Sequence, residues 1–107
     1  MNALSEIKSR FSSVLAEMVD EPAALLNMIR PAGDAKFGDY QANCAMPMGK
    51  QLGKSPREIA TELVEKVPLN DFCQNVEIAG PGFINLTLSA RHWFGGLQKI
   101  QKQKQNL

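Results

Sequence analysis

The chain has 107 residues, of which 44% are hydrophobic and 21% charged, which fits one globular domain and leaves no room for two. Twelve Lys and Arg residues against eleven Asp and Glu residues give a formal net charge of +1. This balance excludes a domain that holds nucleic acid mainly through a strongly basic surface. Any contact with nucleic acid should therefore depend on a few placed side chains.

Cysteine and histidine are scarce, with two of the former and one of the latter. A zinc site takes about four such ligands, so no metal is expected. We expect Cys44 and Cys73 to be reduced, buried thiols of a cytoplasmic protein, the alternative being a disulfide between them. No apolar run reaches the roughly 18 residues of a membrane span, and the N-terminus lacks the pattern of a secretory signal.

An amphipathic helix is predicted from about Ala3 to Val19, where apolar residues recur at steps of three and four. We expect this stripe to pack on a sheet, the alternative being a docking face for another domain. The stripe consists of Leu4, Ile7, Phe11, Val14, Leu15 and Met18.

A short second helix is expected over Ala23–Leu26.

Two short extended segments are expected next. Met28–Pro31 suits a strand that ends at its proline, and Ala32–Ala35 has the residues of a turn. Phe37–Gln41 is either a second short strand or a structured loop.

Two further helices are expected in the middle of the chain. A helical pattern runs from about Ala42 to Leu52, where Pro47 requires either a start near Met46 or a kink, and Gly53 suits the end. The next helix has a clear start, with Ser at the N-cap, Pro at the first position and Glu at the third, and it ends before a proline. These four residues are Ser55, Pro56, Glu58 and Pro68, and the expected buried face is Ile59, Ala60, Leu63, Val64 and Val67.

A hairpin is predicted near the end of the chain. Val76–Ile78 alternates as a half-buried strand, Ala79–Gly82 makes the turn, and Ile84–Leu88 alternates again. A last helix is expected over Ala90–Ile100, followed by a polar tail or linker at residues 101–107. The order of elements predicts a single α+β domain over residues 1–107, with helices packed on a small antiparallel sheet of about four strands.

Catalytic signals are weak in this sequence. The single histidine, His92, stands beside Trp93 with no nucleophile or orienting carboxylate near it in sequence, so we expect a packing residue. Gly80-Pro81-Gly82 lacks the lysine and the following helix of a phosphate-binding loop, and is interpreted as a turn. The chain is therefore not expected to be an enzyme by itself, nor to hold a cofactor.

The segment Lys36–Asn43 combines two aromatic side chains, two amides, one cation and one carboxylate beside a turn. These groups suit an unstacked base, because an aromatic ring can stack on it, an amide can read its edge, and Lys can meet a phosphate. The alternative is a structural turn, with Phe37 and Tyr40 in the core and Asp39 capping backbone amides. The residues alone leave both interpretations open.

Three segments in order, Lys36–Asn43, Leu52–Ala60 and Val76–Asn85, resemble the N-terminal additional domain of arginyl-tRNA synthetases. The resemblance extends from the first helix to about Leu88. It implies an accessory domain that contacts the D-loop at the outer corner of tRNA(Arg), separated from a class I catalytic domain. It also implies that ATP is used only by that catalytic domain, whose signature motifs are missing from this chain.

The resemblance implies RNA contacts in the first of these segments, with Tyr40 and Asn43 ranked highest. The expected tRNA-binding residues are Lys36, Phe37, Tyr40, Gln41 and Asn43, with Lys36 near phosphate. The expected partners are the tRNA(Arg) D-loop and the catalytic domain of the same polypeptide. The alternative function is a protein-interaction or scaffolding domain, in which the exposed side of the first or last helix docks on the catalytic domain or a partner. Trp93 and Phe94, beside the polar tail, favour this alternative.

Overall fold

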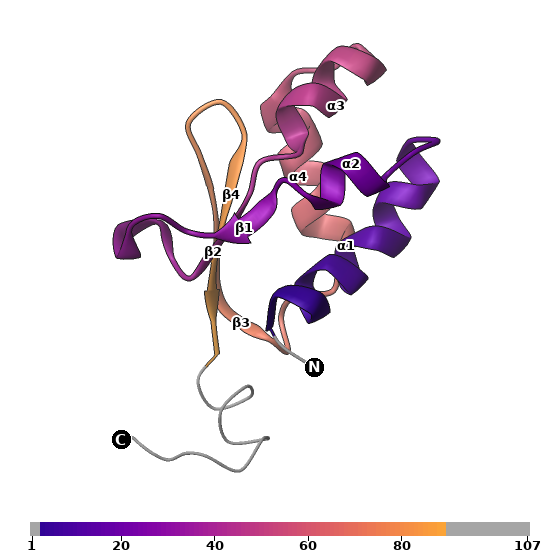
Figure 1. Ribbon diagram of the computed structural model, residues 1–107. Helices are drawn as coiled ribbons and strands as arrows, with labels where there is room; N and C mark the ends of the chain where they lie inside the picture. Colours follow the sequence, from indigo (N-terminus) through magenta and orange to yellow (C-terminus); the bar gives the residue numbers. More distant parts are fainter. Residues whose placement is uncertain (1–2, 90–107) are drawn as a thin grey trace, which may run out of the picture.

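Helices cover one side of a four-stranded antiparallel sheet in the computed structural model, which describes residues 3–89 (Figure 1). This arrangement confirms the expected α+β class. In chain order the elements are α1 (Ala3–Met18), α2 (Ala23–Leu26), β1 (Ile29–Pro31), the 3-10 helix η1 (Ala35–Phe37), β2 (Tyr40–Ala42), α3 (Ala45–Leu52), α4 (Pro56–Lys66), β3 (Cys73–Ala79) and β4 (Phe83–Leu88). The last predicted helix, the tail and His92, Trp93 and Phe94 lie outside the described residues.

Helix α1 packs on the sheet, as its apolar stripe predicts. Ile7, Phe11 and Leu15 are completely buried in the core. On the other side of the helix, Arg10 donates to Glu6 one turn earlier and to both carboxylate oxygens of Asp71, which precedes β3. Its guanidinium also lies 4.7 Å from the ring centre of Phe72. This arginine therefore ties the first helix to the start of the hairpin.

Helix α3 starts at Ala45, so Pro47 falls in its first turn and no kink is needed. The prediction of a helical pattern from Ala42 was three residues early, because Ala42 is the buried last residue of β2. Gly53 ends the helix with φ +68°, the left-handed conformation that glycine adopts most easily.

Helix α4 has the predicted capping box. Ser55 Oγ accepts from the backbone N–H of Glu58, whose carboxylate accepts from the N–H of Ser55. The helix buries Ile59, Ala60 and Leu63, while Val64 is only partly buried against the core. Cys44 and Cys73 are free, buried thiols, which confirms that they form no disulfide.

The strands lie in the order β1-β2-β4-β3, and every neighbouring pair is antiparallel. Strand β3 begins at Cys73, three residues before the predicted start, and a register irregularity lies between Cys73 and Asn75. The segment predicted as a strand or a loop, Phe37–Gln41, is divided between two elements. Residues 35–37 form a 3-10 turn, and only residues 40–42 pair as a strand. Among residues 3–89, no helix has the length and apolarity to cross a membrane.

Candidate nucleic-acid interface

The pairing of the strands separates the side chains of the sheet onto two faces. Ala42 pairs with Ile84, and Tyr40 pairs with Leu86; the helices bury Ala42, Ile84 and Leu86. Gln41 lies between Tyr40 and Ala42, so its side chain belongs to the opposite face. Figure 1 places α1, α2, α3 and α4 on one side of the sheet, so among residues 3–89 no α-helix covers this opposite face, which we name the uncovered face.

A polar row crosses this uncovered face. Arg30 pairs with Gln41, Gln41 with Asn85, and Asn85 with Glu77, so one residue from each strand contributes to the row. Direct cross-strand partners hold their side chains next to each other on one face. The row therefore has a cation on the β1 side, two amides in the middle and a carboxylate on the β3 side.

Three amide side chains are linked by hydrogen bonds on this face. Gln41 Nε2 donates to Asn85 Oδ1 at 2.8 Å, and Asn43 Nδ2 donates to Gln41 Oε1 at 3.5 Å. Asn85 is only 4% exposed, a rare degree of burial for a polar residue. Oδ1 of Asn43 is also enclosed and has no hydrogen-bond partner. We name Gln41, Asn43 and Asn85 the amide cluster.

Asn85 was missed as a site residue from the sequence. The alternation of β4 separates Asn85 from the apolar positions Ile84 and Leu86, which favours a solvent-facing side chain. In the structure it is buried, because its strand is central and Gln41 of β2 lies beside it. The presence of an amide within the third motif was the only sequence signal.

The aromatic residues are distributed differently from the expectation. Tyr40 shares the helix-facing side of the sheet with Leu86 and is half-buried against the core. Phe83 comes two residues before Asn85 on β4, so the half-buried Phe83 shares the uncovered face with the amide cluster. The structure thus brings Gln41 and Asn43 together and places Tyr40 on the other face.

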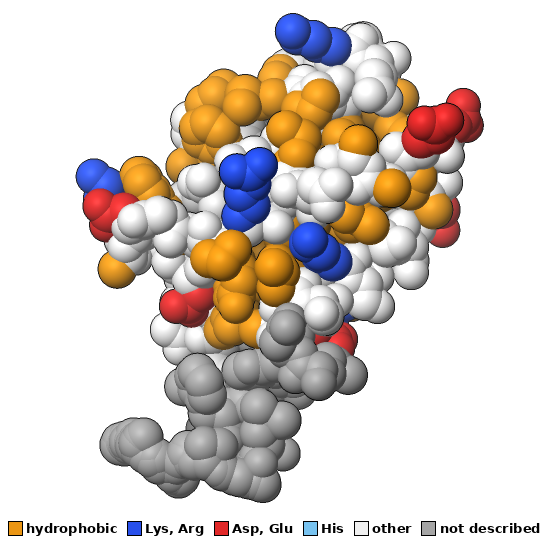
Figure 2. Space-filling view, in the orientation of Figure 1, with side chains coloured by type: hydrophobic (Ala, Val, Ile, Leu, Met, Phe, Trp, Pro, Cys, Tyr) orange, Lys and Arg blue, Asp and Glu red, His pale blue; other side chains and the backbone are white. Residues whose placement is uncertain are grey.

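Lys36 and Phe37 lie in the β1–β2 connection, which projects from the sheet on the side away from the helices (Figure 1). Phe37 is 37% exposed, and the Lys36 ammonium lies 5.2 Å from its ring centre. Figure 2 shows basic, acidic and hydrophobic side chains side by side on this projection, with no continuous basic stripe on the visible face. The small net charge of the chain is consistent with that mixture.

Gly38 and Asp39 attach this connection to β4. Gly38 has φ +89°, and a Cβ at this position would lie 2.7 Å from the carbonyl oxygen of Leu86. Asp39 donates its backbone N–H to that same carbonyl at 2.8 Å, and its carboxylate accepts from the N–H of Leu88 at 2.8 Å. The alternative of a structural turn is therefore right for Asp39, whose carboxylate accepts from a backbone N–H. It is wrong for Phe37, which is exposed and not in the core.

The second and third motifs pack on each other. Arg57 donates to the carbonyl of Gly80, at the turn of the β3–β4 hairpin. A Cβ at Gly82 would lie 2.9 Å from the Cβ of Pro56, so only glycine fits against the start of α4. These contacts give a packing role to the second motif and to the Gly80-Pro81-Gly82 turn of the third. The uncovered face is formed by other residues, which belong to the first and third motifs.

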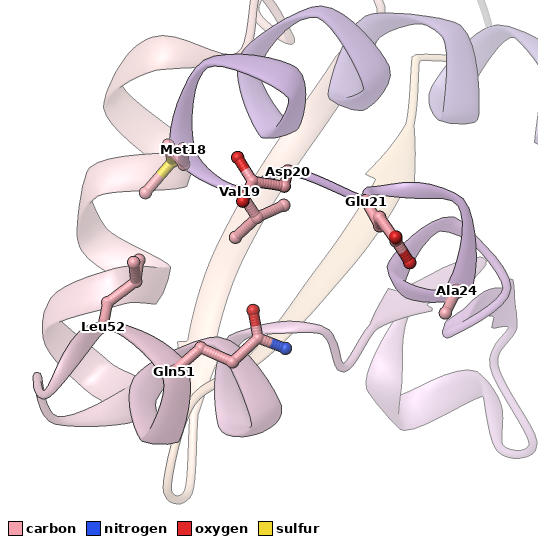
Figure 3. A pocket seen from close by; sticks show the side chains of 7 residues that line it. All are labelled: Met18, Val19, Asp20, Glu21, Ala24, Gln51 and Leu52. Atoms are coloured by element: carbon pink, nitrogen blue, oxygen red, sulfur yellow. The ribbon is translucent and has the colours of Figure 1, made fainter.

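An open hollow of about 530 Å³ lies between the end of α1, the link to α2 and the end of α3 (Figure 3). Its lining residues are Met18, Val19, Asp20, Glu21, Ala24, Gln51 and Leu52. None of them belongs to the uncovered face of the sheet. In the part of the chain from Ala3 to Ser89, no group of three His, Cys, Asp or Glu side chains could hold a metal ion.

Comparison with known proteins identifies relatives over most of the chain. The family model described as "Arginyl tRNA synthetase N terminal domain" matches residues 5–88. The chain is 43% identical over 100 residues to an arginine–tRNA ligase of Rhodopirellula baltica, a match that covers 94% of this chain and 15% of that protein. It is 46% identical over 99 residues to an arginine–tRNA ligase of Synechococcus sp., with 92% and 17% covered.

A solved structure shares the fold. The crystal structure of arginyl-tRNA synthetase from Plasmodium falciparum superimposes with a TM-score of 0.65 at 20% identity, over 82% of this chain and 16% of that chain. The chain thus spans about one sixth of the length of these relatives.

Proposed function

The chain belongs to the arginyl-tRNA synthetase N-terminal domain family, and we propose that it is an accessory domain that binds tRNA(Arg) through the D-loop. In this role it helps to position the tRNA for arginylation by the catalytic domain of the same polypeptide. The arginine and ATP sites belong to that catalytic domain, so the chain by itself does not charge tRNA. A cytoplasmic location is part of the same proposal.

The amide cluster is the observation that carries this proposal. Amide side chains offer both hydrogen-bond donors and acceptors, which is what reading the edge of an unpaired base requires. Phe83 on the same face and Phe37 on the projecting connection supply aromatic surfaces on which a base can stack. The net charge of the chain is only +1, so recognition depends on placed contacts rather than on a broad positive field.

The proposed contact set keeps the five residues expected from the sequence and adds two. Lys36 meets a phosphate beside the projecting loop. Tyr40 contributes only through its exposed part and ranks below Asn43, because its ring packs against the core. The complete set is Lys36, Phe37, Tyr40, Gln41, Asn43, Phe83 and Asn85.

A second candidate function is docking onto the catalytic domain. The observation that favours it is the hollow beside α1 and α3, where Leu52 is 36% exposed. Exposed large apolar side chains are common at docking surfaces, although single ones are also normal. The two functions use different faces of the domain, and Leu52→Lys would impair docking without changing tRNA affinity.

Binding to two tRNAs tests the first proposal. The 107-residue chain is titrated with tRNA(Arg) and with the same tRNA carrying a changed D-loop base, at moderate salt. We expect weak binding that falls by about tenfold with the changed base, the worth of one base contact. Equal affinity for both tRNAs contradicts base reading.

A further inference from the structure

We propose that Gln41 is a positioning residue that turns the amide of Asn85, so that Asn85 presents its nitrogen, and not its oxygen, to a base. This inference rests on the proposed function and names the chemistry of its contact. The base that fits must offer a hydrogen-bond acceptor, such as a ring nitrogen or a carbonyl oxygen, at the edge that meets Asn85.

The direction of the amide cluster is the first step of the argument. Each side-chain amide has one acceptor oxygen and one donor NH₂ group. Asn43 Nδ2 donates to Gln41 Oε1, and Gln41 Nε2 donates to Asn85 Oδ1. Turning any single amide would place two oxygens or two nitrogens against each other. The three amides are therefore coupled, and no one of them can turn without the others.

The free end of this chain of hydrogen bonds is the second step. Oδ1 of Asn85 is occupied by Gln41, whereas Nδ2 of Asn85 donates no hydrogen bond to any residue of the described range 3–89. Among residues 3–89, the one enclosed side-chain atom that lacks a partner is Oδ1 of Asn43, so Nδ2 of Asn85 is not fully enclosed. Asn85 is 4% exposed, so the small accessible part of the side chain includes its donor.

The opposite end of the cluster is closed. Asn43 Oδ1 is enclosed and cannot meet a ligand without movement of its neighbours. The backbone N–H of Asn43 donates to the carbonyl of Met28, which fixes Asn43 at the end of β2. The NH₂ group of Asn85 is therefore the hydrogen-bonding group of the cluster that is left for a ligand. Gln41, in the middle of the cluster, determines whether Asn85 presents its nitrogen or its oxygen there.

Exchanging Gln41 for Glu is the sharpest test. A carboxylate cannot donate to Asn85 Oδ1, so the Asn85 amide should turn, donate to Glu and expose its oxygen. Asn43 still donates to the carboxylate, which retains the rest of the cluster. Gln51→Glu, at the exposed end of α3, is the matched control with the same change of charge.

Nuclear magnetic resonance of the free 107-residue chain reports this turn without RNA. In Gln41→Glu, the side-chain NH₂ signals of Asn85 should move downfield because they gain a charged acceptor. They should stay in place in Gln51→Glu. Unchanged Asn85 signals in a folded Gln41→Glu variant overturn the proposal. Gln41→Met, which removes both polar groups, covers the case in which Gln41→Glu does not fold: Asn85 should then lose its single orientation and show averaged NH₂ signals.

The consequence for recognition is tested with tRNA(Arg) that carries adenine or unsubstituted purine at the contacted D-loop position. Purine keeps the ring nitrogens and lacks the amino group, so the wild-type domain should bind both within about twofold. Gln41→Glu should favour adenine by about tenfold, because it then offers an acceptor. An unchanged ratio overturns the proposal. If the Asn85 signals respond and no protein binds tRNA, the orientation is supported and the proposed function fails.

Discussion

Gln41 and Asn85, 44 residues apart in the chain, are joined by a 2.8 Å hydrogen bond between Nε2 of Gln41 and Oδ1 of Asn85. This contact links the first and third motifs on the uncovered face of the sheet. Gly38 and Asp39 strengthen the same link through the backbone of Leu86 and Leu88. The glycine and the aspartate of the first motif therefore hold it against β4, and the amides of the two motifs are joined to each other on the uncovered face.

Replacement of Asn43 and of Tyr40 should separate binding from folding. Asn43→Ala should lower tRNA affinity by about 1–3 kcal/mol, because it removes the donor that holds Gln41 in place and so disturbs the base contact of the cluster, with a smaller loss of stability. Tyr40→Ala should lower the free energy of unfolding by about 2–3 kcal/mol, because its ring packs against the core. Chemical denaturation and tRNA titration measure the two effects.

Tyr40→Phe is the control for that comparison, because it keeps the ring and removes only the hydroxyl. It should retain most of the stability. A Tyr40→Ala variant as stable as the wild type would contradict the placement of this ring.

Substitution of Gly38 should destabilise the domain. Gly38→Ala needs a left-handed backbone at φ +89° and places a Cβ 2.7 Å from a backbone oxygen, so we expect a loss of about 1–3 kcal/mol. Gly33→Ala is the matched control, since its Cβ would meet nothing within 4 Å. Urea denaturation of the two variants measures the difference. Equal stabilities would show that β4 does not approach Gly38 as described.

The salt dependence of tRNA binding should report the contribution of Lys36. This exposed lysine is the cation of the projecting loop, so Lys36→Gln should lower the slope of log affinity against log salt by about 1. Lys66→Gln is the control, because Lys66 lies on α4 and is paired with Glu62. Titrations at several salt concentrations give the slopes, and identical slopes for the two variants would exclude a phosphate contact at Lys36.

The two thiols should make stability fall in alkaline solution. Burial raises the pKa of Cys44 and of Cys73 from 9.0 to about 11 in the folded chain. Unfolded thiols ionise first, so the stabilising effect is complete below about pH 9 and is lost as the pH rises towards about 11. The free energy of unfolding, measured across this window, should fall less steeply in the Cys44→Ala/Cys73→Ala double variant. Parallel curves would contradict the burial of the thiols.

Local features of the fold could be predicted from the sequence because nearby residues determine them. The capping box of Ser55 and Glu58 depends on residues three positions apart, and the helix end at Gly53 depends on one residue that tolerates a positive φ. The stripe of α1 follows from helical periodicity. Each of these was confirmed.

The candidate site could be predicted only in part, because it depends on pairing between distant strands. No local pattern reveals that Gln41 of β2 lies opposite Asn85 of β4. Alternation alone placed Asn85 towards solvent, and adjacency in sequence grouped Tyr40 with Gln41, although successive residues of a strand point to opposite faces. The exposed position of Phe37 likewise follows from the attachment of Gly38 and Asp39 to β4.

The central claim is that the uncovered sheet face binds the D-loop of tRNA(Arg). Chemical-shift mapping of the ¹⁵N-labelled 107-residue chain, titrated with tRNA(Arg), tests it most directly. The account predicts the largest changes at Lys36, Phe37, Gln41, Asn43 and Asn85, and their loss when the D-loop base is changed. Changes confined to the hollow around Val19 and Leu52, or changes unaffected by the D-loop, would contradict it.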